Sequence, residues 1–271
     1  MKKHISYRSS ELLSSLLHNE KWFFSLKEAL EILNNSNPVS VRRLLSDMTK
    51  RGLILRIKDG LYSIIPYEKD AGYYLPNWHL VAEALVQEQK YYIGFYSALD
   101  LYGLITQPAL VEQVVTEKQI VPKYRIIRKA KFEFITMGKR FFGYNKTWVD
   151  NFNKVYCSDL EKTILDCLYM PGEANGISEV VNSLSRIIEK INPEKLLSYL
   201  DKFDSQAVNK RLGFILQNMD VLKDLKYEIN KKISSSYILL DPSLPKSGKY
   251  NSEWKIIDNV AINSTIQSAM N

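Results

Sequence analysis

The sequence predicts an α+β fold in two domains. Its 271 residues exceed the roughly 100 to 200 residues of a usual single domain. Apolar residues recur at helical spacing in the first fifty residues and again after residue 158, whereas residues 111–137 alternate as strands do. We expect a first domain at residues 1–66, a linker at 67–80, and a mixed second domain at 81–271 with a small β-sheet and several helices.

Composition is typical of a folded, water-soluble chain. Hydrophobic residues make up 45% and charged residues 25%. No apolar run reaches the roughly 18 residues of a membrane helix, and the basic start lacks the apolar segment of a signal peptide. Cys157, Cys167 and three scattered histidines have no metal-ligand spacing. We therefore expect a cytoplasmic protein without a metal, a cofactor or a membrane partner.

The positive charge is concentrated in two regions. Of a net charge of +7, residues 1–65 hold 11 Lys or Arg against 6 Asp or Glu, and residues 123–146 hold 8 against 1. A local basic excess suits a phosphate backbone, because neutralising phosphates releases condensed counterions. A solvated, lysine-rich surface would give the same counts.

Two helices are predicted before residue 34. Over residues 9–20, leucines recur at the i, i+1, i+4 and i+5 spacing of one helical face. The second helix begins at Ser25, because Ser25 and Glu28 have the spacing of a capping box, in which each side chain satisfies a free backbone N–H.

A third helix is predicted from Pro38 to about Arg51. Asn37 can cap it, Pro38 suits the first helical position, and Gly52 can end it. Apolar residues at i, i+3, i+4 and i+7 would pack on the first two helices: Val41, Leu44, Leu45 and Met48. The opposite face is polar and net positive, with Ser40, Arg42, Arg43, Ser46, Asp47 and Lys50.

Two strands, LILRI and LYSII, are predicted to follow. They are joined at Lys58-Asp59-Gly60, where Gly60 can adopt the positive φ of a tight turn. Three helices and a basic hairpin, in this order, predict a winged helix-turn-helix, whose third helix enters the major groove. We expect these residues to bind DNA: Ser40, Arg42, Arg43, Ser46, Lys50, Arg51, Arg56 and Lys58.

The second basic region lies among predicted strands. Helices are expected at residues 78–89 and 96–104, the latter with Ser97 and Asp100 as candidate caps, and strands at 111–137. The basic residues, interleaved with aromatics, are Lys123, Arg125, Arg128, Lys129, Lys131, Lys139 and Arg140. They predict either a second nucleic-acid surface or a sheet face whose cations meet water.

From Ser158 onward the sequence predicts four helices, followed by two strands near the C-terminus. Carboxylates lie in the first of these helices. Asp159, Glu161 and Asp166 suggest acid–base or metal chemistry. Ser158 and Glu161, however, have capping-box spacing, and Asp159 would lie in a first turn, where negative charge is favourable. Because no phosphate-binding loop, nucleophile elbow or HExxH is present, the sequence predicts no enzyme.

The order and spacing of these sequence blocks along nearly the whole chain resemble those of the AbiEi-type antitoxins of bacterial abortive-infection, type IV toxin–antitoxin systems. The resemblance is carried by the N-terminal pattern and by YYIGFYSALDLYGL, SDLEKTILDCLYMPGEANGISEVV and LDPSLPKSGKYNSEWKIIDN. It implies that the first domain represses its own operon by binding inverted repeats in the promoter, and that both domains offer basic surface. It also implies that the second domain counters a nucleotidyltransferase-like toxin, with or without direct contact.

The sequence is also compatible with two other classes of function. A winged-helix adaptor would bind a partner protein without specific DNA binding. A nuclease would hold a metal with the carboxylates between Asp159 and Glu173, and its cleavage would be lost on Asp166→Ala.

Overall fold

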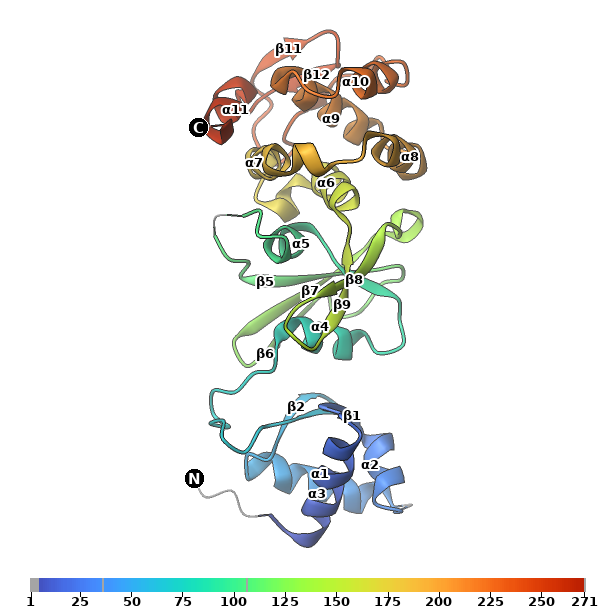
Figure 1. Ribbon diagram of the computed structural model, residues 1–271, viewed down its shortest axis with the longest axis vertical. Helices are drawn as coiled ribbons and strands as arrows, with labels where there is room; N and C mark the ends of the chain where they lie inside the picture. The colour runs from blue at the N-terminus through green and yellow to red at the C-terminus, as the bar shows by residue number, and fades with distance from the viewer. Residues whose placement is uncertain (1–4, 36, 106, 271) are drawn as a thin grey trace. The chain divides into compact units, whose positions relative to one another are not determined.

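The chain folds as a mixed α+β structure in two compact units (Figure 1). The computed structural model describes residues 5–35, 37–105 and 107–270. The units comprise residues 1–89 with 126–130, and residues 90–125 with 131–271. The first unit therefore extends past residue 66, where the sequence places the end of the first domain. Residues 1–4 and 271 of the expected domains lie outside the described residues.

The first unit begins with the three helices that the sequence predicts. They are α1 (Tyr7–His18), α2 (Leu26–Ile32) and α3 (Pro38–Lys50). The predicted capping box forms, since the Glu28 N–H donates to Ser25 Oγ (3.2 Å) and the Ser25 N–H donates to Glu28 Oε2 (2.8 Å). The predicted cap of α3 forms as well, because Asn37 Oδ1 accepts the Val39 N–H at 3.0 Å.

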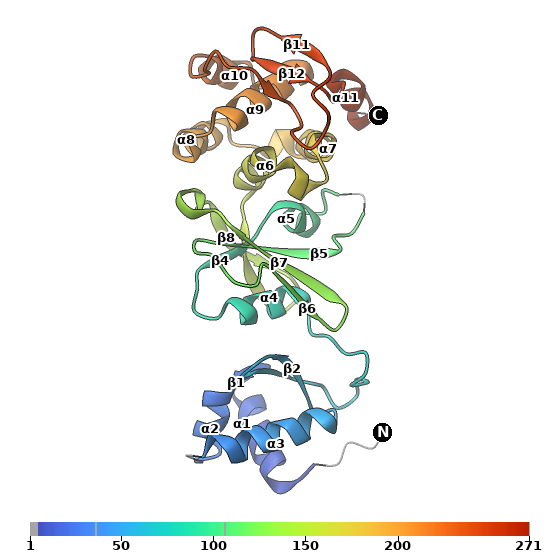
Figure 2. The same ribbon diagram turned by 180° about the vertical axis from the view of Figure 1, so that it is seen from behind.

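A three-stranded antiparallel sheet packs on these helices, as Figure 2 shows. Its strands are β1 (Phe23–Ser25), β2 (Ile54–Lys58) and β3 (Leu61–Ile64), in the order β1-β3-β2. The sequence predicts the β2–β3 hairpin but not β1. Phe24 of β1 is 1% exposed and joins Leu12 and Leu16 in the core of the unit.

Gly52 ends α3 and lets a later segment approach closely. Its φ of +71° is the left-handed conformation that glycine adopts without strain. A Cβ at this position would lie 2.5 Å from the Cβ of Ala71, so the turn after β3 packs against the end of α3. Helix α4 (Trp78–Val86) follows in the same unit.

The second unit is built on a mixed sheet. Its order among the described residues is β6-β7-β5-β4-β9-β8. The strands are β4 (Tyr91–Ile93), β5 (Val111–Thr116), β6 (Tyr124–Ile127), β7 (Ala130–Thr136), β8 (Tyr144–Trp148) and β9 (Lys154–Ser158). Pairs β5–β7 and β4–β9 are parallel. Of these strands, the sequence predicts only β5 to β7. Strands β4 and β8 are not predicted, because β4 is a short apolar run and β8 is rich in polar residues.

Helix α5 (Phe95–Leu101) covers one face of this sheet, and the later helices lie beyond it on the same side (Figure 1). These later helices are α6 (Leu160–Tyr169), α7 (Ile177–Ile187), α8 (Pro193–Phe203), α9 (Gln206–Met219), α10 (Lys223–Asn230) and α11 (Ile262–Met270). Short strands β10 (Ile238–Leu239), β11 (Lys249–Asn251) and β12 (Ile256–Asp258) form a further sheet. Tyr92 and Val115 of the large sheet share one core with Ile164 of α6. Within the described chain, no helix has the length and apolarity to cross a bilayer.

Two predicted helix caps are wrong. Helix α5 has Gly94 at its N-cap without a side-chain cap, while Ser97 Oγ donates to the Val111 carbonyl and Asp100 accepts the Ala109 N–H. Helix α6 is capped one residue later than expected, by Asp159, which accepts the Lys162 N–H at 3.0 Å. In both cases tertiary partners engage the side chains that local spacing assigns to caps.

Candidate nucleic-acid interface

The buried face of α3 determines which side of the helix meets solvent. Val41, Leu45 and Met48 are at most 1% exposed and pack in the core of the first unit. They have the i, i+4 and i+7 spacing of one helical face. Because each buried side chain of this size contributes roughly 1.5 to 3 kcal/mol, the opposite face is held toward solvent.

That opposite face carries four exposed side chains in line, which we call the α3 stripe. They are Val39, Arg43, Ser46 and Lys50. Their i, i+4, i+7 and i+11 spacing places them above one another along the helix. Arg42 is exposed on one flank, and Ser40 is half-buried on the other. The predicted recognition residues of this helix therefore share one surface.

Three cations of this surface have no partner inside the described part of the protein. Arg42, Arg43 and Lys50 make no hydrogen bond or ion pair there through their side chains. Ser40 differs, because it accepts a hydrogen bond from Asn35 (3.1 Å) and donates one to the Asn37 carbonyl (3.0 Å). The three cations can meet a phosphate or a base edge, whereas Ser40 holds the first turn of the helix.

The β2–β3 hairpin presents Arg56. Its guanidinium pairs with Asp59 at 2.7 Å, and both side chains are exposed. Such surface pairs contribute little to stability and leave further N–H groups of arginine available to a ligand. Gly60 completes the turn with a φ of +70°.

Two predicted contacts on this unit are engaged within the protein. Arg51 donates to the Asp47 carbonyl (3.2 Å) and to Ser9 Oγ (3.1 Å), so it ties the end of α3 to α1. Lys58 donates to the Leu85 carbonyl at the end of α4 (3.0 Å). Cations at helix C-termini satisfy free carbonyls and suit the helix dipole. The sequence indicates the charge of these side chains but not these partners.

The second basic region is divided between the two units. Arg128 and Lys129 belong to the first unit, whereas the other residues of the region belong to the second. Arg128 donates to the Ala71 carbonyl at 2.6 Å, and Lys129 is exposed. The β6–β7 turn thereby joins the segment that packs against Gly52 at the end of α3.

Of the second basic region, most cations that belong to the second unit have intramolecular partners. Lys123 pairs with Glu133 at 2.8 Å, and this contact raises the pKa of Lys123 above its usual value. Lys131 lies 4.4 Å from the ring centroid of Tyr124, as a cation–π contact. Arg125 is half-buried.

Arg140 and Lys139 lie together in a short 3-10 helix, Gly138–Arg140, but differ in environment. Arg140 donates to the carbonyls of Phe203 (2.8 Å) and Asp204 (3.0 Å) and stacks 4.7 Å from the ring centroid of Tyr169. It therefore closes the C-terminal end of α8. Lys139 is exposed.

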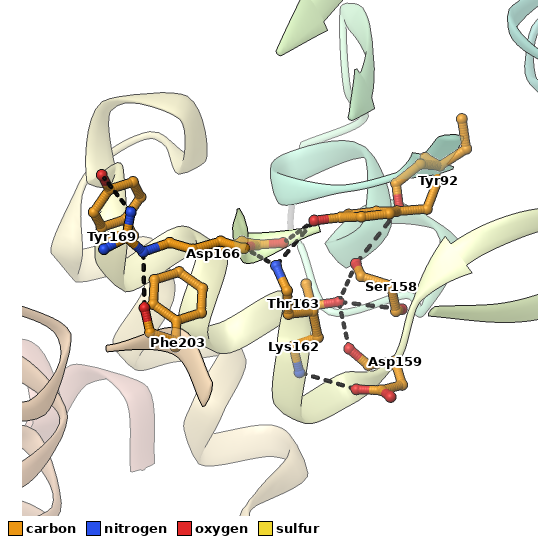
Figure 3. Close-up of polar contacts among 10 residues, drawn as sticks. Tyr92, Ser158, Asp159, Lys162, Thr163, Asp166, Tyr169 and Phe203 are labelled. Carbon is orange, nitrogen blue, oxygen red and sulfur yellow. Dashed lines mark hydrogen bonds and ion pairs between the residues drawn. The ribbon is translucent and has the colours of Figure 1, made fainter. Parts of the chain in front are cut away.

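A buried ionic cluster in the second unit was not predicted from the sequence (Figure 3). Lys162 forms an ion pair with Asp166 one helical turn away, and both side chains are fully buried. The Lys162 ammonium also donates to the Tyr92 hydroxyl (2.9 Å), which donates to Asp166 Oδ2 (3.0 Å). Burial lowers the pKa of Lys162 and raises those of Asp166 and Tyr92. The i, i+4 spacing within an apolar helix is the signal that indicates this pair.

The neighbouring carboxylates also have structural partners. Lys195 of α8 pairs with Glu161 (2.6 Å) and Asp159 (3.2 Å) of the α6 start, and Tyr199 donates to Asp159 (2.9 Å). Burial alone would raise the pKa of Glu161, but hydrogen bonds from Lys195 and the Asn192 N–H outweigh it and hold that pKa below its usual value. No group of three or more His, Cys, Asp or Glu suited to a metal occurs within the described residues.

Comparison with solved structures shows a shared fold. The chain is similar to the crystal structure of the RV2827C protein from Mycobacterium tuberculosis, with a TM-score of 0.72 and 12% sequence identity. The match covers 99% of this chain and 96% of that chain. No protein-family model and no curated protein matches the sequence.

Proposed function

We propose that this protein is a DNA-binding transcriptional repressor of its own operon. Helix α3 would be the recognition helix of a winged helix-turn-helix, and the β2–β3 hairpin its wing. The observation that carries the proposal is the exposed face of α3, where Arg42, Arg43 and Lys50 have no partner in the described chain and lie opposite a fully buried face.

Helix α3 has the length and the chemistry for a major groove. Its 13 residues span roughly 20 Å. Arginine can pair bidentately with guanine, serine can reach a base edge or a phosphate, and lysine can neutralise a phosphate. Arg56 of the wing would meet the neighbouring backbone, and Lys129 on the β6–β7 turn of the same unit would add a further cation.

The proposal includes an antitoxin role for the second unit. It rests on the resemblance to AbiEi-type antitoxins, which implies a nucleotidyltransferase-like toxin as the functional partner. A cytoplasmic location and the absence of catalysis belong to the same proposal. Co-expression with the product of the neighbouring gene tests it, because an antitoxin restores growth and a repressor without that role does not.

The DNA-binding part is tested by fluorescence anisotropy. The full chain would be titrated with its own upstream DNA and with a scrambled duplex at several salt concentrations. We expect preference for the upstream DNA and a log–log salt slope that rises by about 0.9 per phosphate contact. The double variant Arg42→Ala/Arg43→Ala should lose the preference for upstream over scrambled DNA. The control Lys190→Ala, at an exposed cation of the second unit, should leave this preference unchanged.

A second candidate function is a winged-helix adaptor that binds another protein. An apolar hollow of about 420 Å³ on the first unit favours it. Leu17, Trp22 and Tyr67 line this hollow and are 45%, 46% and 69% exposed. Weak, equal binding of the upstream and scrambled duplexes would support the adaptor over the repressor.

A further inference from the structure

Val39 has an unusual place among the exposed side chains of the first unit. It is the second residue of α3, and 73% of its surface is exposed. Single exposed apolar residues are common on proteins, so exposure alone indicates nothing. Its position matters because Val39 begins the α3 stripe, with Arg43 one turn further along the helix.

The first turn of α3 holds this side chain in a defined position. Asn37 Oδ1 accepts the backbone N–H of Val39 (3.0 Å), and Pro38 fixes the preceding φ. A β-branched side chain in a helix has one strongly preferred χ1 rotamer. The two methyl groups of Val39 are therefore presented at the N-terminal end of α3, which in a recognition helix is the end that contacts base edges.

The neighbouring charges indicate what covers the valine. Arg42 and Arg43 are exposed beside it and unpaired within the described chain, so a polyanion suits this face better than an apolar protein groove. In the major groove, the apolar feature of a base pair is the C5-methyl group of thymine. Valine has no polar atom in its side chain, so this methyl group is the base edge that it can recognise.

We propose that Val39 contacts the C5-methyl group of a thymine in the operator. Four residues of helix advance about 6 Å, which corresponds to about two base pairs at 3.4 Å each. The thymine then lies about two base pairs from the guanine that Arg43 reads. This inference rests on the proposed function and specifies a base at one position of its DNA site.

The test removes one methyl group at a time. Each thymine of the upstream duplex is replaced in turn by deoxyuridine, and affinity is measured by anisotropy for the wild-type protein and for Val39→Ala. For the wild type, we expect one position in each half-site at which affinity falls roughly fourfold, the equivalent of one buried methyl group. Val39→Ala should lose a similar factor on thymine DNA and show no further loss at that position.

A matched control and a check on folding accompany the test. Val121→Ala removes the same atoms from a side chain that is 74% exposed and lies outside α3, and it should keep the deoxyuridine sensitivity. Val39→Thr retains one methyl group and should keep part of the sensitivity. Circular dichroism establishes that the variants are folded.

The outcomes separate this inference from the proposed function. Preference for upstream DNA with the same deoxyuridine profile in wild type and Val39→Ala would overturn the thymine contact alone. Preference without any sensitive thymine would overturn it as well. Equal binding of upstream and scrambled DNA by the wild type would overturn the repressor, and the thymine contact with it.

Discussion

The ammonium group of Lys58 donates a hydrogen bond to the backbone carbonyl of Leu85 at 3.0 Å. The hairpin that follows α3 is thereby joined to the last turn of α4, within one unit. A charge that the sequence assigns to a DNA phosphate thus has a structural partner, while Arg56, two residues earlier, is exposed.

Lys58→Met should destabilise the first unit by about 1 kcal/mol, because it removes the donor to Leu85 and keeps the apolar stem. Its DNA affinity should change less than that of Arg56→Ala. Urea unfolding and anisotropy measure the two effects. A larger loss of affinity for Lys58→Met than for Arg56→Ala would show that the ammonium leaves Leu85 to bind DNA.

Arg43→Ala should weaken binding to the cognate site by roughly 1 to 3 kcal/mol and reduce its preference over other sequences. Lys129→Ala, on the β6–β7 turn, should weaken all sequences alike, because a phosphate contact carries no sequence information. Competition with cognate and random duplexes distinguishes the two. Equal losses on both duplexes for Arg43→Ala would remove its base-reading role.

Arg140→Ala should lower the free energy of unfolding by roughly 2 kcal/mol. The guanidinium donates to two carbonyls at the end of α8 and stacks on Tyr169, so its loss leaves those carbonyls without a donor. Lys139→Ala is the matched control, since Lys139 is the exposed neighbour. Unchanged stability of Arg140→Ala together with weaker DNA binding would instead assign Arg140 to the interface.

Asp166→Asn should destabilise the protein by about 3 to 5 kcal/mol, because it leaves the buried ammonium of Lys162 without its counter-ion. The double variant Lys162→Met/Asp166→Leu should recover most of this loss, since two apolar side chains need no partner. Asp201→Asn is the control, because its ion pair with Lys232 is exposed. A double variant as unstable as the single one would contradict this account.

Glu161→Gln should flatten the acid limb of the stability curve. The folded pKa of Glu161 lies below the unfolded value of about 4.3, so its contribution is present above that value and is lost as pH falls through the folded pKa. Urea unfolding between pH 3 and 7 compares the variant with the wild type. Glu194→Gln, at an exposed carboxylate of α8, should leave the curve as it is.

Local signals predict the first three helices and the hairpin of the first unit. Ser25 with Glu28, Asn37 before Pro38, and the glycines at 52 and 60 each act within a few residues, and the structure confirms the helices and the hairpin that they predict. Strand β1 was missed because its three residues depend on pairing with β3, not on local alternation. The exposed face of α3 was predictable because the buried face has helical spacing.

Tertiary partners account for what the sequence did not reveal. Ser158 and Glu161 have the spacing of a capping box, but the Ile93 carbonyl and Lys195 engage them in the folded protein. Arg51, Lys58 and Arg140 are read from the sequence as free cations, yet each donates to a carbonyl distant along the chain or at a helix end. The identity of a cation is local information, whereas its partner depends on the fold.

The hydrogen bond from Arg128 to the Ala71 carbonyl limits where the protein can be truncated without loss of a contact in the first unit. The first unit is discontinuous in sequence, since the chain leaves it after Gln89 and contributes to it again at Ile126–Ala130. A fragment that stops at residue 66 or 89 would lack the arginine that holds the turn beside Gly52. An excised first unit therefore keeps this hydrogen bond only if the β6–β7 turn is grafted onto it or the chain is kept whole.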